Sequence, residues 1–169
     1  MQQPKFDLAV IMRKRAIDNR WQPEVWEPAG VLMQSNAERS EAWSTGAPEP
    51  EHVLAEDDRD EWLFRGFHLG LRREDAEGYY LNISTMQPRV FVRWQLQDGI
   101  GVPERVTASY NDACTWMDAG QQVDSVAMPP ELYDFVHEFV RQHYRPEPKK
   151  RIRPRSFQSR DQAPRTRQR

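Results

Sequence analysis

Two apolar patterns in the second half of the chain constrain the fold most strongly. Between residues 62 and 109, apolar side chains such as Val90, Val92 and Trp94 alternate with their neighbours at a period of two, which is typical of antiparallel strands with one buried face. Residues 130–144 instead repeat apolar side chains at helical spacing. Such a sheet needs a cover for its apolar face. The patterns therefore predict an α+β fold, an antiparallel β-meander or small open barrel capped by an amphipathic C-terminal helix.

Local signals divide the rest of the chain into shorter elements. Pro23 and Pro28 exclude a regular central strand across residues 21–28. Asn111 can cap a short helix that ends near Gly120. Residues 35–61 are polar and aperiodic, which predicts a long acidic loop. The strands are expected within residues 8–12, 31–33, 62–71, 79–84, 90–96 and 105–109, with turns at 74–78, 87–88 and 98–99.

The small net charge of −2 hides two segments of opposite sign. Residues 145–169 hold ten basic and two acidic side chains, whereas the preceding 144 residues have a net charge of −10. The basic segment is also rich in proline and poor in apolar residues, so we expect it to be disordered. The sequence thus predicts one globular domain over residues 1–144 and a basic tail over residues 145–169. Nucleic acid, an anionic membrane surface, an acidic protein or the acidic domain itself could attract such a tail.

The residues give no strong signal for a chemical activity. Cys114 has no basic neighbour that would lower its pKa and is interpreted as a packing residue. His137 and His143 are six positions apart on one helix, which is not a metal-ligand spacing. His68 remains a candidate only if carboxylates converge on it in a cleft. We expect no enzyme activity, no cofactor and no metal. No apolar run approaches the about 18 residues that cross a membrane, so a cytoplasmic protein is expected.

The candidate binding residues fall into three groups. Trp21 and Trp26 lie in a proline-interrupted segment, where exposed tryptophans can anchor a protein partner. Arg89, Phe91 and Arg93 alternate on one strand face, as in a platform that stacks bases and contacts phosphates. The basic tail supplies a third group, which consists of Lys149, Lys150, Arg151, Arg153 and Arg155.

Three segments resemble a known protein family. They are NRWQPEVWEPAGVL at residues 19–32, VDSVAMPPEL at residues 123–132 and HYRPEPKK at residues 143–150. The chain resembles, over about residues 8–150, a family of small proteobacterial proteins of unknown function. The genes of that family lie near those for molybdenum-dependent formate dehydrogenases and their maturation factors. The resemblance implies a bacterial accessory role and supplies no catalytic residues.

These observations favour a non-enzymatic accessory or binding protein. Its partner would be a protein, for which the resemblance suggests a formate dehydrogenase component or maturation factor. Nucleic-acid binding through the basic tail is the alternative. A small enzyme built around His68 is the third possibility.

Overall fold

The computed structural model describes residues 5–34 and 50–146. Its first sheet has four antiparallel strands in the order β2-β1-β4-β3. Its second sheet has three antiparallel strands in the order β6-β5-β7. The strands are β1 Lys5–Ala16, β2 Glu24–Met33, β3 Glu51–Glu56, β4 Arg59–Gly70, β5 Arg89–Gln97, β6 Ile100–Thr107 and β7 Val123–Ala127.

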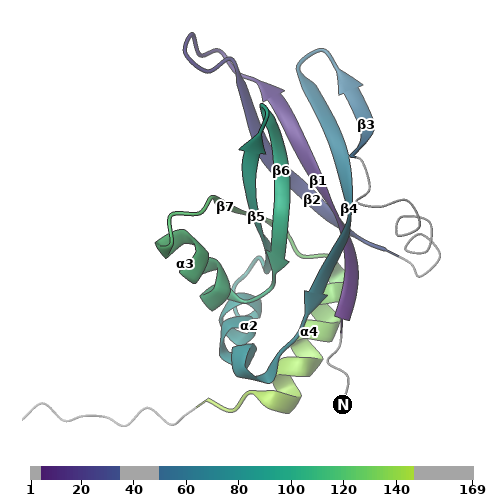
Figure 1. Cartoon of the computed structure of the whole chain (residues 1–169). Helices are drawn as coiled ribbons and strands as arrows, with labels where there is room; N and C mark the ends of the chain where they lie inside the picture. Colours follow the sequence, from purple (N-terminus) through teal and green to yellow (C-terminus); the bar gives the residue numbers. More distant parts are fainter. Residues whose placement is uncertain (1–4, 35–49, 147–169) are drawn as a thin grey trace, which may run out of the picture.

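The helices gather at one end of the two sheets, the lower end in Figure 1. They are the short 3-10 helix η1 Arg73–Asp75 and the α-helices α2 Ala76–Ile83, α3 Tyr110–Asp118 and α4 Pro130–His143. One hydrophobic core joins these layers: Val10 of β1, Val92 of β5 and Val136 of α4 belong to the same buried cluster. The predicted α+β class and antiparallel sheets are confirmed, and the described strands form two sheets without closing into a barrel.

The C-terminal helix agrees closely with its predicted pattern. Pro130 occupies the first turn, where a missing N–H costs nothing. Its buried side chains, Leu132, Val136, Phe139 and Val140, recur at helical spacing and enter the core. The turn at Asp98 and Gly99 is also confirmed, since both residues have positive φ angles, of 52° and 79°, as a tight hairpin turn requires.

Residues 79–84 were predicted to be a strand, and this prediction is wrong: residues 76–83 form α2. Alternation placed Tyr79 and Leu81 on one face, but Tyr79 is 1% exposed and Leu81 is 42% exposed. The buried residues Ala76, Tyr79 and Asn82 instead follow a three-residue spacing. In a segment this short, the two periods cannot be separated by apolar residues alone. The turn predicted at residues 74–78 is likewise replaced by the end of η1 and the start of α2.

The loop predicted over residues 35–61 is corrected in its described part. Residues 51–61 contain β3 and the first residues of β4, which pair as an antiparallel hairpin. β3 is an edge strand with almost every side chain exposed. Because neither face of β3 is buried, its sequence has no alternation of apolar and polar residues that would indicate a strand. Residues 35–49 lie outside the described residues, as does the predicted tail from residue 147 onward.

Pro28 lies within a strand, but that strand is at the edge of its sheet. β2 contains Pro28 opposite Met12 of β1, next to a register shift between Ile11 and Met12. An edge strand or a bulge is where a sheet tolerates the missing N–H of proline. The exclusion of a central strand is thus confirmed, although β2 is more regular than the sequence predicts. β1 also continues beyond Met12, because Arg13, Lys14 and Arg15 pair with both β2 and β4. Arg13 forms an ion pair with Glu61 of β4 at 2.8 Å in this part of the strand.

Trp26 of β2 connects the two sheets. Its indole Nε1 donates a hydrogen bond to the Gly99 carbonyl at 3.0 Å, and its ring packs against Trp62 of β4 with centroids 5.0 Å apart. Gly101 of β6 lies directly against Trp26, so that a Cβ added there would be 2.8 Å from the Trp26 Cβ. Trp26 and Gly101 are therefore fitted to each other.

A second fixed connection joins α2 to the second sheet. The buried Asn82 Nδ2 donates hydrogen bonds to the carbonyls of Arg89 at 2.7 Å and Ala108 at 2.8 Å. Its Oδ1 accepts a hydrogen bond from the Arg89 amide at 2.9 Å. A buried amide with its hydrogen-bonding groups satisfied holds the helix in one position.

The Trp26–Gly101 contact gives a direct test of the fold. We expect Gly101→Ala to lower the free energy of unfolding by about 1–3 kcal/mol, because the added methyl group overpacks the junction. Gly70→Ala is the matched control, since nothing lies within 4 Å of its added Cβ, and we expect it to change stability by less than about 0.5 kcal/mol. Urea unfolding measures both. Equal stability of the two variants would contradict the close fit.

Candidate functional site

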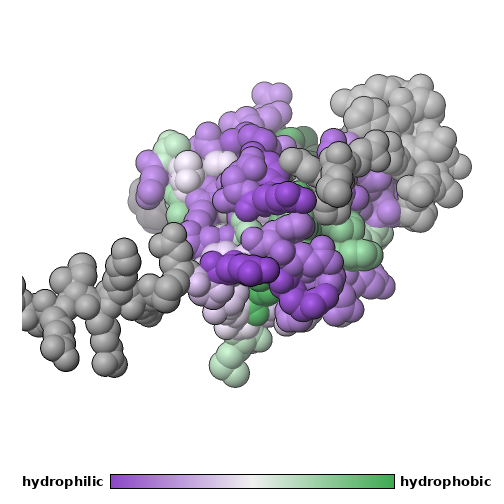
Figure 2. All heavy atoms as spheres, turned by 90° about the horizontal axis from the view of Figure 1, so that it is seen from below, coloured by the Kyte–Doolittle hydropathy of each residue, from purple (hydrophilic) through white to green (hydrophobic). Residues whose placement is uncertain are grey.

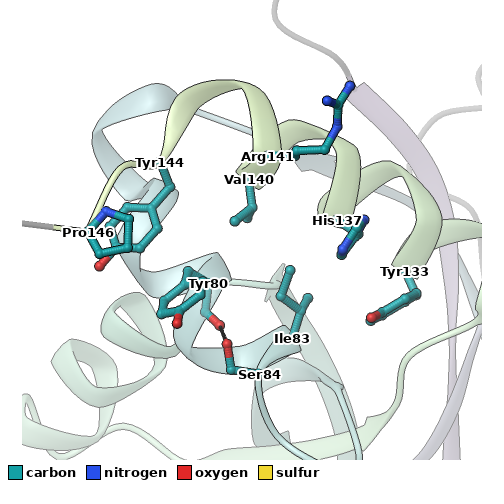
Figure 3. Close-up of a pocket in the computed structure, with 9 residues that line it drawn as sticks. All are labelled: Tyr80, Ile83, Ser84, Tyr133, His137, Val140, Arg141, Tyr144 and Pro146. Carbon is teal, nitrogen blue, oxygen red and sulfur yellow. Dashed lines mark hydrogen bonds between the residues drawn. The ribbon is translucent and has the colours of Figure 1, made fainter.

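An open cavity of about 360 Å³ lies between α2 and α4. Figure 3 shows the rings of Tyr80, Tyr144 and Pro146 gathered at one end of it and those of Tyr133 and His137 at the other, with Ile83 and Val140 between them. The remaining lining residues are Ser84 and Arg141. The cavity is therefore a cleft with aromatic walls and an aliphatic floor.

A second cavity, of about 370 Å³, continues from the first. The two share Ile83 and Tyr133, so we treat them as one surface, the helical groove. The residues that line only the second cavity are Thr85, Met86, Pro88, Met128, Pro130 and Asp134. Figure 2 views the molecule from this helical end and shows apolar surface exposed between hydrophilic side chains.

The helical groove follows from how α2 and α4 use their apolar residues. α4 directs Leu132, Val136 and Phe139 into the core, which leaves Tyr133 and His137 at the surface beside α2. In α2, Tyr79 points inward whereas its neighbour Tyr80 is partly exposed. The rings of Tyr80 and Tyr144 lie 4.7 Å apart, and those of Tyr133 and His137 stack at 5.8 Å. Each end of the first cavity thus has a pair of rings in contact.

Some charged side chains along the groove form ion pairs with described residues and one does not. Arg141 forms two hydrogen bonds to Glu138, at 2.8 and 2.7 Å, and points away from the cavity in Figure 3. The hydrogen bonds from Arg141 and Gln142 lower the pKa of Glu138 to about 2, so this pair is charged and mutually compensated at neutral pH. Asp134 lines the other end of the groove and forms no ion pair with any residue of the described part of the chain. The groove therefore offers one uncompensated carboxylate.

The two tryptophans predicted as partner anchors lie in different environments. Trp21 is 90% exposed in the connection between β1 and β2, and the Arg20 guanidinium lies 5.9 Å from its ring centroid. Trp26 is 8% exposed and is committed to the junction between the sheets. Trp26 is therefore a core residue and not a surface anchor. Its sequence neighbours do not indicate this burial, because the second sheet that covers it comes from a distant part of the chain.

Arg89, Phe91 and Arg93 lie on β5, but they do not form a free platform. Arg89 Nε donates a hydrogen bond to the Ser125 hydroxyl at 3.1 Å, and Phe91 makes an edge contact with Tyr110 of α3. Arg93 pairs with Glu104 at 3.1 Å and lies over the ring of Trp116. These contacts occupy the faces that bases and phosphates would need.

The segment predicted as the strand before β5 does not extend the face of Arg89, Phe91 and Arg93, because its residues Tyr80, Asn82 and Ser84 lie on α2 or at its end. The basic residues Lys149, Lys150, Arg151, Arg153 and Arg155 lie outside the described residues.

His68 lies beside the carboxylate of Asp7. Its Nδ1 lies 2.5 Å from Asp7 Oδ1, across the pairing of β4 with β1. The side chain is 39% exposed, and neither cavity of the helical groove includes it. Within residues 5–34 and 50–146, no group of three or more His, Cys, Asp or Glu side chains is placed to hold a metal ion. No helix in that part of the chain is long and apolar enough to cross a membrane.

A second electrostatic perturbation surrounds Tyr79. Burial is the main cause that raises its pKa to about 12. The Tyr79 hydroxyl accepts a hydrogen bond from the Arg72 amide at 3.1 Å and donates one to the Gly70 carbonyl at 3.4 Å. Burial and the neighbouring Asp112 carboxylate also raise the pKa of Asp75, against the effect of Arg72 2.6 Å away. These groups fix the start of α2, and a phenol that stays neutral is a structural partner rather than a base.

The Tyr79 pKa predicts a specific alkaline effect. An unfolded tyrosine ionises near pH 10, whereas the folded phenol stays protonated up to about pH 12. Its contribution to stability is therefore complete below pH 10 and is lost as the pH rises from about 10 to about 12. Tyr79→Phe should lower stability at neutral pH, by about 1 kcal/mol for the lost hydrogen bonds, and this deficit should shrink in that alkaline range. Urea unfolding of both proteins at a series of pH values measures it, with Tyr110→Phe as an exposed control. A deficit that stays constant would contradict the assignment.

Comparison with known proteins identifies a family without an assigned activity. The model of a family described as "Protein of unknown function (DUF3305)" matches residues 7–153. This range includes the described strands β2 to β7 and all the described helices. No curated protein and no solved structure matches the chain.

Proposed function

The chain belongs to the DUF3305 family of proteins of unknown function, and we propose that it is a non-enzymatic accessory protein that holds a protein partner at its helical end. The observation that carries this proposal is the helical groove with its exposed apolar rim. Met86 and Tyr80 line this groove, and their side chains are 100% and 38% exposed. Exposed apolar side chains grouped around an open cleft are typical of protein interaction sites.

The side chains of the groove suit binding better than catalysis. Its polar groups are hydroxyls, the His137 ring, the Arg141 guanidinium and the Asp134 carboxylate. The Arg141 guanidinium is paired with Glu138, and the Ser84 hydroxyl donates to the Tyr80 carbonyl of the preceding helical turn at 2.6 Å. A nucleophile would need an adjacent base that is itself oriented by a third group. Tyrosines that present both a ring and a hydroxyl are instead common anchors at protein interfaces. The connection between β1 and β2 lies at the end of the sheets opposite the helices (Figure 1). Its exposed Trp21 supplies a second candidate contact.

The first partners to test come from the resemblance described above. It implies a role beside molybdenum-dependent formate dehydrogenases and their maturation factors. We therefore propose assembly or maturation of such an enzyme as the specific process. The groove is open at the surface, which is compatible with a partner that docks without unfolding this chain.

Partner capture tests the proposed function. The full chain with an affinity tag is expressed in its native host and purified, and captured proteins are identified by mass spectrometry. We expect one partner to be enriched with the wild-type chain and to be reduced at least about ten-fold with Tyr80→Ala, as for an interface hot spot. Tyr110→Ala, an exposed tyrosine on α3, is the matched control and should retain the partner. Trp21→Ala shows whether the second contact is used.

Two results would contradict the proposed function. The first is the absence of any protein that wild type enriches over Tyr80→Ala and Trp21→Ala together. The second is a captured partner that is lost equally with Tyr110→Ala, since that variant leaves the helical groove intact. Circular dichroism of each variant confirms that the fold is retained.

The concentration of basic residues after Tyr144 favours nucleic-acid binding as a second candidate function. A sequence-independent binder held by phosphate contacts should lose affinity steeply as salt rises. We expect binding of a single-stranded oligonucleotide to weaken with salt and to disappear in a full-length variant with glutamine at five positions: Lys149, Lys150, Arg151, Arg153 and Arg155. Fluorescence anisotropy measures both. Binding that is absent at low salt, or that survives the glutamine variant, would exclude this function.

A further inference from the structure

The helical groove has a shape and a lining that favour one kind of peptide. Its walls are pairs of aromatic rings, Tyr80 with Tyr144 and Tyr133 with His137, and its floor is formed by Ile83 and Val140. Aromatic-lined grooves bind extended proline-containing segments, because the proline rings fill the spaces between aromatic rings and the peptide carbonyls face tyrosine hydroxyls.

The chain itself places a proline at one end of the groove, two residues after a residue with an extended backbone. At Tyr144, directly after α4, the backbone has φ −101° and ψ 128°, which is extended. Pro146 then lines the cavity together with Tyr80 and Tyr144. A proline from a bound peptide would contact a similar pair of aromatic rings at the other end of the first cavity, where Tyr133 and His137 lie.

The length of the groove sets the size of the segment. The groove follows the whole of α4, since its lining residues extend from Pro130, at the first position of the helix, to Tyr144, directly after its last residue. This helix of 14 residues rises about 21 Å, and about seven residues in the polyproline II conformation, at about 3.1 Å each, cover that distance. Pro88 and Met128 line the far end.

The charge of the groove indicates which charge the bound segment should have. Arg141 and Glu138 compensate each other, and Asp134 is the lining carboxylate that lacks an ion-pair partner among residues 5–34 and 50–146. A basic side chain placed over Asp134 would complete the pair, whereas an acidic one would be repelled. Because Asp134 is exposed to solvent, the contribution of this pair to affinity is small.

We propose that the helical groove binds an extended, proline-containing segment of a partner protein, with prolines packed against the tyrosine rings and an arginine or lysine paired with Asp134. This inference rests on the proposed function and specifies the part of the partner that is recognised. It commits to a partner protein as the source, so a helical peptide and a second copy of this chain are the competing occupants.

A peptide titration tests the inference. The probe is a synthetic peptide of about seven residues that contains prolines and one terminal arginine, made with the arginine at either end. It is added to the isotope-labelled full chain, and backbone amide signals are followed by NMR. We expect shifts confined to residues around Tyr80, Ile83 and Tyr133 with at least one of the two peptides. A peptide with alanine in place of every proline should bind at least about ten-fold more weakly.

Matched variants assign the contacts. Tyr80→Ala should weaken peptide binding at least about ten-fold, and Asp134→Asn should weaken the arginine peptide about two- to five-fold. Tyr110→Ala and Asp118→Asn, both exposed on α3, should change the affinity less than two-fold, within about 0.4 kcal/mol. A peptide with glutamate in place of the arginine should bind the wild-type chain more weakly than the arginine peptide binds Asp134→Asn, because the two carboxylates repel each other.

Three results would overturn the inference. They are the absence of shifts at millimolar peptide, equal binding of the alanine peptide, and a Tyr80-dependent dimer of the wild-type chain on gel filtration. The first two refute recognition of proline, and the third assigns the groove to a second copy. If partner capture depends on Tyr80 while the proline peptides fail to bind, the proposed function stands and only this inference is lost.

Discussion

The contact between Trp26 and the turn of the β5–β6 hairpin is the constraint on which the arrangement of the sheets depends. Two sheets that meet only through aliphatic side chains can slide, because apolar contacts have little directionality. Trp26 adds a directional hydrogen bond to the Gly99 carbonyl and a steric fit to Gly101 that excludes any larger residue. Together these contacts fix where the second sheet lies on the first.

With the sheets fixed, the core is open toward one end, where the helices cover it (Figure 1). α4 uses its continuous apolar stripe for that purpose, and α2 is held through Asn82 to the backbone of β5 and at Ala108. The helical groove results from this arrangement, because side chains of α2 and α4 that do not enter the core remain exposed where the two helices meet. The candidate binding surface and the closure of the core therefore come from the same two elements.

The predictability of the fold differed between elements for physical reasons. α4 and β5 were predicted well because each buries one continuous face in the core. The spacing of their apolar residues therefore shows the period of the helix or strand directly. α2 was mistaken for a strand because only two turns of helix are too few to separate the periods. β3 was missed because its side chains are exposed and its stability comes from backbone pairing with β4. The candidate site shared this problem: its tyrosines come from two helices that are far apart in the sequence, and nothing local indicates their pairing.

The sequence by itself determined the α+β class, the antiparallel pairing, the capping helix and the separation of an acidic domain from a basic C-terminal segment. These properties follow from periodicity and charge, which are local or additive along the chain. Only the tertiary structure decided that Trp26 is buried while Trp21 is exposed, that α3 and the strands occupy the faces of Arg89 and Arg93, and that Tyr80 meets Tyr144. Each of these outcomes depends on which surfaces cover one another, and burial by a distant element leaves no signal in the residues around the position that it covers.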